Sequence, residues 1–169
     1  MELSQEQIES LFASREKQLL SKRNFKSVEL TRDWGRTFPR EAGVYIIFEK
    51  NKICYIGETG SLRGRMTDML NTANHVIRRN IGHDKYNGHA EFKRASSRQR
   101  FHLDIEALIE SDLKRDFKVS AIPIEIGRKE LEEWLIKNHT PKYNNKGKRS
   151  TPQSKQEKWQ SAVNEMYLD

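Results

Sequence analysis

The sequence has few of the residues that build covalent or metal-held frameworks. Its 169 residues include one cysteine, Cys54, which excludes an intrachain disulfide. His83 and His89 have no cysteines nearby, which argues against a zinc site. Walker loops, dinucleotide fingerprints and internal repeats are also absent. Because no apolar run approaches the roughly 20 residues of a membrane span and the amino terminus has no signal-peptide pattern, we expect a cytoplasmic protein without membrane contact.

Positive charge is the property that the sequence has in excess. Its 31 lysine and arginine residues against 24 aspartate and glutamate residues leave a formal net charge of +7, and only 35% of the residues are hydrophobic. A basic, polar surface suits a nucleic-acid partner, although many soluble proteins are equally basic. The residues that we expect to contact phosphates, unless they form an ordinary solvated face, are Arg63, Arg78, Arg79, Lys93, Arg94, Arg98, Arg100 and Lys142.

Two short β-branched runs, at 43–49 and 53–56, predict a β-hairpin. Alternate residues of a strand share a face, so Tyr55 is expected on the same face as Ile53. The short connection makes the two strands antiparallel neighbours. The hairpin is therefore expected to place the phenols of Tyr45 and Tyr55 side by side on one surface.

A turn and a helix are predicted directly after the hairpin. Gly57 is expected to end the second strand, and residues 58–60 to form the turn. Ser61 is a suitable helix N-cap for the apolar stripe that follows. Arg65 lies one turn into this helix and is expected to face back over the hairpin.

Two phenols and a guanidinium at one sheet edge suit phosphate chemistry. Arginine can fork onto phosphate oxygens, and a phenol can pass a proton if nearby cations lower its pKa. The competing interpretation is that the tyrosines are a cross-strand packing pair. Further motifs are needed to decide between the two.

Those motifs come from the far end of the chain. Residues 127–137 have helical spacing, and the pattern stops before Pro141. The full set consists of GVY at 43–45, CYIG at 54–57, Leu62-x-x-Arg65, Glu132-x-x-x-Ile136 and PKYN at 141–144. This combination, over about residues 41 to 145, resembles the GIY-YIG nuclease superfamily.

The resemblance implies an α+β fold with a small central three-stranded antiparallel sheet flanked by helices. It also implies a metal-dependent phosphodiesterase that uses Mg²⁺ or Mn²⁺. Tyr45 and Tyr55 match the two motif tyrosines, and Arg65 matches the arginine that contacts the scissile phosphate. Glu132 matches the metal-ligand glutamate, and Asn144 the asparagine that closes the site.

Three positions leave alternatives open. Glu133 adjoins Glu132, and because neighbouring helical side chains diverge by about 100°, only one of them can face the site. Glu58 stands where several relatives carry lysine, and we favour a solvated turn residue over an acid beside the site. His75 is added to the catalytic set because residues 71–79 resemble a segment of some standalone members. A histidine that caps or packs a helix is the alternative.

The sequence divides into a core with an attachment at each end. We expect an N-terminal helical and basic extension at 1–40, the nuclease core at 41–145, and a basic linker with a short terminal helix at 146–169. Within the core, the remaining elements are expected to be a helix at 71–82, a loop at 83–97, a helix at 101–113 and a strand at 119–126.

These observations predict a standalone endonuclease that acts on DNA. A restriction-type enzyme that cuts duplex sites as a homodimer is favoured over a repair or mobile-element nuclease, because no second recognisable domain accompanies the core. A non-catalytic nucleic-acid-binding module is the main alternative, although all five matched positions carry the expected residue types. An enzyme that acts on single strands or RNA is the other, since nothing in the sequence distinguishes the 2′-hydroxyl.

Overall fold

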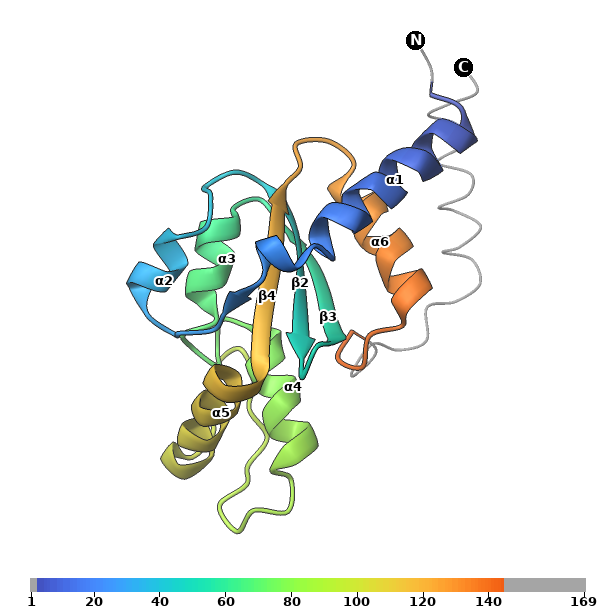
Figure 1. Cartoon of the computed structure of the whole chain (residues 1–169). Helices are drawn as coiled ribbons and strands as arrows, with labels where there is room; N and C mark the ends of the chain where they lie inside the picture. Colours follow the sequence, from blue (N-terminus) through green and yellow to red (C-terminus); the bar gives the residue numbers. More distant parts are fainter. Residues whose placement is uncertain (1–2, 145–169) are drawn as a thin grey trace.

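The computed structural model describes residues 3–144, which form a four-stranded antiparallel sheet with helices on both faces (Figure 1). The α+β class expected from the sequence is confirmed, with four strands in place of three. Strand β1 has only two residues, too few for an alternating pattern to reveal it. The terminal helix expected within 146–169 lies outside the described residues. The sheet order is β1-β4-β2-β3, with β1 at Lys26–Ser27, β2 at Gly43–Glu49, β3 at Lys52–Thr59 and β4 at Phe117–Pro123.

Strands β2 and β3 form the predicted hairpin, but β3 is longer than expected. Its last two residues pair with the start of β2. The expectations that Gly57 ends the strand and that 58–60 form a turn are therefore wrong. Gly57 lies inside β3, opposite Tyr45, because the Tyr45 ring occupies the space that a side chain would need.

A β-bulge at Cys54 sets the direction of the second tyrosine. The register changes between Ile47, which lies opposite Tyr55, and Phe48, which lies opposite Ile53. The extra residue turns Ile53 to the opposite face of the sheet from Tyr55, so the expectation that these two share a face is wrong. The Cys54 thiol donates a hydrogen bond to the Ile47 carbonyl at 3.3 Å.

The two faces of the sheet carry separate apolar cores. One face, called the phenol face below, buries Tyr45 and Ile47, and the opposite face buries Val44 and Ile46. The two cores give the sheet a helical layer on each side, as Figure 1 shows. The phenol face is covered by α2 (Arg32–Arg36), α3 (Leu62–Asp68), α4 (Val76–Lys85) and α5 (Leu103–Asp116), and the opposite face by α1 (Gln5–Leu19) and α6 (Arg128–His139).

Helix termini follow their capping residues. Ser61 caps α3 as predicted, since its hydroxyl accepts the Gly64 N–H at 3.1 Å. The helix expected at 71–82 begins only at Val76, because His75 is its N-cap. Pro123 is the last residue of β4, beyond the part of the strand that pairs with β1.

The N-terminal region is packed into the domain. Leu19 at the end of α1 is fully buried in the core of the opposite face. Phe12 of α1 contacts the ring of Trp134 of α6, with centroids 5.8 Å apart. Glu16 and His139 link the same two helices at 2.5 Å. Helices α1 and α6 therefore cover the opposite face as one layer.

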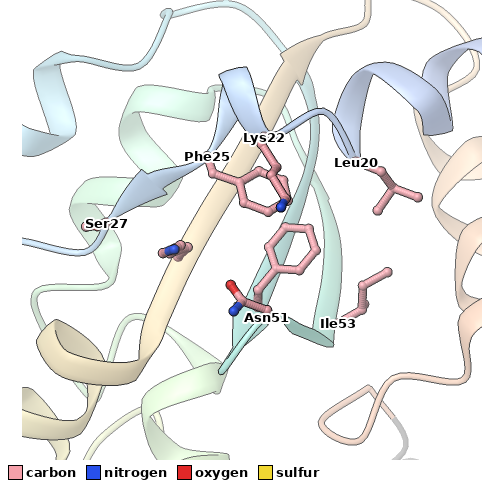
Figure 2. Close-up of a pocket in the computed structure, with 8 residues that line it drawn as sticks. Leu20, Lys22, Phe25, Ser27, Asn51 and Ile53 are labelled. Atoms are coloured by element: carbon pink, nitrogen blue, oxygen red, sulfur yellow. The ribbon is translucent and has the colours of Figure 1, made fainter.

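The opposite face is hollowed near the hairpin turn, at the carboxyl end of α1 (Figure 2). The hollow has a volume of about 650 Å³ and combines apolar side chains with two lysines. The hollow is lined by Leu20, Lys22, Phe25, Ser27, Phe48, Asn51, Ile53 and Lys118.

No helix within residues 3–144 is both long and apolar enough to cross a membrane.

The close packing at Gly57 gives a stability prediction. A β-carbon at this position would lie 2.6 Å from Cζ of Tyr45, so the ring would have to move. Gly57→Ala should lower the free energy of unfolding by about 1–3 kcal/mol, measured by urea unfolding. Gly60→Ala is the control, because a β-carbon there meets nothing within 4 Å, and it should change stability by less than about 0.5 kcal/mol. Equal losses in the two variants would contradict this packing.

Candidate active site

The two tyrosines meet diagonally across the hairpin. Tyr45 lies opposite Gly57, and Tyr55 lies opposite Ile47. Their ring centroids are 6.0 Å apart. Tyr45 is fully buried, whereas Tyr55 is only partly buried. Tyr55 is therefore the phenol of the pair that solvent or a ligand can reach.

Arg65 reaches back from α3 to the phenols, as the sequence predicted. Its Nε donates a hydrogen bond to the Tyr45 hydroxyl at 3.1 Å, and its Nη1 donates to the Asn74 carbonyl at 3.2 Å. Asp68 approaches Nη1 at 3.5 Å. Burial opposes the charge of Arg65, but the nearby phenols more than offset this, and the pKa of Arg65 is raised.

His75 caps α4, the alternative that the sequence left open, and it also contacts a phenol. Its Nδ1 accepts the Ile77 backbone N–H at 3.1 Å and so caps α4, while its Nε2 lies 3.3 Å from the Tyr45 hydroxyl. Burial, followed by the charges of Arg65 and Arg79, lowers the pKa of His75 well below 6.5. In the neutral ring Nδ1 is an acceptor, so the proton is on Nε2. His75 therefore donates to Tyr45 and does not accept its proton.

The order in which the two phenols ionise follows from their surroundings. The Tyr45 oxygen receives N–H groups from Arg65 and His75. Burial raises the pKa of both phenols, and the neighbouring Tyr55 raises that of the more deeply buried Tyr45 further. The charge of Arg65 lowers the pKa of both phenols, but burial outweighs it. Tyr55 is thus the phenol that ionises first.

Glu132 lies at the open edge of β3. It comes from α6, and its Oε1 accepts the Glu58 backbone N–H at 3.2 Å. The neighbouring Glu133 is exposed to solvent. After burial, the Glu132 carboxylate is a further cause of the raised pKa of Tyr55, so carboxylate and phenol are in electrostatic reach of each other. Of the two adjacent glutamates, Glu132 is the one directed to the site.

Asn144 completes the same edge through its side-chain amide. Its Oδ1 accepts the Ile56 N–H at 2.8 Å, and its Nδ2 donates to the Ile56 carbonyl at 2.7 Å. The Tyr143 N–H donates to the Cys54 carbonyl at 2.9 Å. Asn144 therefore pairs with the strand as a backbone would, and it fixes the edge beside Glu132.

Glu58 is not the solvated turn residue that we favoured. It lies in β3, its side chain is largely shielded, and its Oε2 is 3.2 Å from Nε of Arg128. Arg128 is a residue that the sequence analysis missed. The signal available was its spacing of four from Glu132, which places both residues on one side of α6. The Arg128 guanidinium is the cation that balances Glu58 beside the site.

Comparison with solved structures finds similarity to the GIY-YIG N-terminal endonuclease domain of UvrC from Thermotoga maritima bound to magnesium. The identity is 23% and the TM-score 0.41, and the match covers 67% of this chain and 93% of that one. Two point mutants of that domain, each bound to the catalytic divalent cation, give 23% and 22% identity, TM-scores of 0.38, and coverage of 67% of this chain and 92% of theirs. No family model and no curated protein matches the chain. At this level of similarity, the function has to be inferred from the side chains of this chain.

Three of the residues expected to contact phosphate form hydrogen bonds or ion pairs within the protein instead. Arg78 is buried and pairs with Glu106 at 2.7 Å, so it is not available to nucleic acid. Arg63 donates from Nε to the Phe38 carbonyl at 3.0 Å and from Nη2 to the Arg36 carbonyl at the end of α2 at 3.1 Å. Lys142 forms an ion pair with Asp84 at 2.6 Å. The spacing of charges along the chain does not show which face of its element each residue occupies.

The other expected phosphate contacts remain accessible. Lys93, Arg94, Arg98 and Arg100 are exposed in the connection between α4 and α5. Arg79 is partly buried beside the phenols, where its charge acts on His75. The accessible cations therefore lie both at the site and on the neighbouring loop.

The oxygen donors at the β3 edge fit a hard cation that is shared with substrate. Within residues 3–144, no three His, Cys, Asp or Glu side chains converge on one point. Mg²⁺ commonly keeps several waters and needs only one or two carboxylates in addition to substrate phosphates. Glu132 supplies one carboxylate, held in place through the Glu58 N–H. These residues fit Mg²⁺ or Mn²⁺ and do not fit a closed zinc site.

Because His75 is buried and neutral, the free energy of unfolding should depend on pH. Folding suppresses protonation of His75, so below pH 6.5 the unfolded chain binds a proton that the folded chain does not. Stability should therefore fall with falling pH, by up to about 1.4 kcal/mol per pH unit. His75→Asn retains an N-cap acceptor and should lack this component in urea unfolding between pH 7.5 and 5.

The control for this variant is His102→Asn. His102 occupies the same N-cap position on α5, where its Nδ1 accepts the Asp104 N–H, but it is exposed. This variant should keep the acid sensitivity of the wild type. An unchanged pH slope in His75→Asn would refute the assignment.

Proposed function

We propose that this chain is a metal-dependent endonuclease that hydrolyses phosphodiester bonds in DNA, as a member of the GIY-YIG nuclease superfamily. The observation that supports it most directly is the meeting of four polar side chains on the phenol face. Tyr45, Tyr55, Arg65 and His75 come from four separate parts of the chain, and Glu132 stands at the adjoining edge. A cross-strand packing pair needs neither the guanidinium nor the imidazole.

Each group of the site has a separate task in this proposal. Arg65 holds a non-bridging phosphate oxygen and offsets the charge that develops on it. Glu132 holds the metal ion, which when bound acts as a Lewis acid on the scissile phosphate. His75 and Arg65 fix the Tyr45 oxygen as a double acceptor, so its own proton is directed to Tyr55. Tyr55 contacts the attacking water.

The proton step is assigned to Tyr55 as phenolate. The pKa of Tyr55 is raised above 10.0, chiefly by burial, so the phenolate fraction increases about tenfold with each pH unit at neutral pH. The Tyr45 proton, directed to Tyr55 in this proposal, stabilises that phenolate. The phenolate takes a proton from water as the oxygen of that water attacks phosphorus. The bond from phosphorus to one ester oxygen breaks, and that oxygen leaves and takes a proton from solvent.

We further propose duplex DNA as the substrate, cut at specific sites in the manner of a type II restriction enzyme. The exposed cations of the α4–α5 connection support contact with the backbone on one side of the cut. Helix α4 has 10 residues and a length of about 15 Å, with His75 at its start and the basic connection beyond its end. At about 3.4 Å per base pair, this separation corresponds to four or five base pairs.

Exchange of Glu132 tests the nuclease function. Glu132→Gln keeps the acceptor for the Glu58 N–H and removes the metal ligand. Cleavage should fall by more than the roughly 100-fold typical of outer-shell partners of a metal. Glu133→Gln is the matched control, because it removes the same charge one residue away on the exposed side of α6.

The assay uses plasmid duplex, single-stranded DNA and RNA, each with Mg²⁺ and with EDTA. We expect discrete, metal-dependent fragments from the duplex. Preferred cutting of single strands or RNA would overturn the duplex proposal. Binding without cutting on all three substrates would point to a non-catalytic module.

The two phenols should respond differently to removal of the hydroxyl. The wild-type cleavage rate should rise about tenfold per unit between pH 7 and 9 if Tyr55 acts as phenolate. Tyr55→Phe should be slow and lose this dependence, whereas Tyr45→Phe should be slowed but keep it. Single-turnover rates across this pH range measure both variants. A pH slope that is lost only in Tyr45→Phe would reverse the two assignments.

A further inference from the structure

Three consecutive backbone carbonyls hold two guanidinium groups beside the phenols. The carbonyls of Thr72 and Ala73 each accept a hydrogen bond from Nη1 of Arg79 at 2.9 Å. The next carbonyl, of Asn74, accepts from Nη1 of Arg65 at 3.2 Å. One short segment thus fixes an arginine from α3 and an arginine from α4 next to each other.

The segment that holds these arginines is itself rigidly supported. The Thr72 hydroxyl, which is buried, donates to Glu106 at 2.6 Å and accepts from Nε of Arg78 at 3.1 Å. The Asn71 side chain accepts the Ala73 N–H at 2.9 Å. The buried Arg78 network therefore acts as a support behind residues 72–74, and the two arginines in front are held in place before any ligand binds.

Few negative charges lie near Arg65 and Arg79 to balance their two positive charges. Burial, and then the positive charge of Arg65, lower the pKa of Arg79. The neighbouring His75 is neutral, and the carboxylate near Arg65 is Asp68, whose side chain is 42% exposed. Two guanidiniums fixed side by side in partly buried positions repel each other, and an anion between them removes that cost.

We propose that Arg65 and Arg79 form one anion site in front of Tyr55, in which Arg79 is a second catalytic residue that contacts the phosphodiester group to be cut. Within residues 3–144, the hydrogen bonds of Arg79 all come from Nη1, so Nε and Nη2 keep donors for a ligand. Two guanidiniums match the non-bridging oxygens of a phosphodiester. The assignment of the anion as a DNA phosphate rests on the proposed function.

The test measures binding of a fluorescent 16-base-pair duplex in EDTA, so it does not depend on cleavage. In Arg79→Gln, binding at 50 mM NaCl should weaken about 5- to 20-fold. The slope of log K against log salt should fall by about 0.9, as expected for the loss of one phosphate contact. Arg79→Lys keeps the charge and should recover most of the binding, but not the cleavage rate with Mg²⁺.

Arg23→Gln is the control, since Arg23 is exposed in the short helix at Lys22–Asn24, outside the site. Its salt slope should stay close to that of the wild type. The proposal would be overturned if the salt slope of Arg79→Gln equalled that of Arg23→Gln. It would also be overturned if the wild type did not bind the duplex. A lower melting temperature with an unchanged slope would reduce Arg79 to a support for residues 72–74. Arg79-dependent binding without cleavage of any substrate would keep the anion site and reject the nuclease function.

Discussion

The buried hydroxyl of Tyr45 is the group that joins the separate elements of the site. β3 approaches it through Gly57, α3 donates to it through Arg65, and His75, the N-cap of α4, is the second donor. A buried oxygen that accepts two N–H groups loses more than one hydrogen bond if it moves, because both donors would be left without a partner. The position of this one atom therefore sets the distance between the helices of the phenol face and the strand that carries Tyr55.

The second constraint is that the exposed edge of β3 must be covered. β3 is the last strand of the sheet, and an uncovered edge would present free N–H and C=O groups. Asn144, Tyr143 and Glu132 occupy these groups in turn. One hydrogen bond thus both closes this part of the edge and places the carboxylate, because the Glu58 N–H that needs a partner is the group that orients Glu132.

Local patterns in the sequence predicted the parts of this arrangement that depend on local physics. The hairpin, the Ser61 cap and the return of Arg65 follow from strand alternation, capping and helical spacing. The bulge at Cys54 breaks the alternation without any glycine or proline to mark it, so the face of Ile53 was wrong. The burial of Arg78 depends on Glu106, 28 residues away, and no spacing rule reports such a contact.

The contact between Asn144 and Ile56 spans 88 residues, whereas the phenol pair is complete within a single hairpin. Contacts between distant residues form late in folding, since the loop between them must first be closed. During synthesis, the hairpin and α3 leave the ribosome well before residues 132 and 144 have been made. In a nascent chain, the phenols and Arg65 are therefore already present before Glu132 and Asn144 have been made. The site becomes complete only when the whole domain has been synthesised.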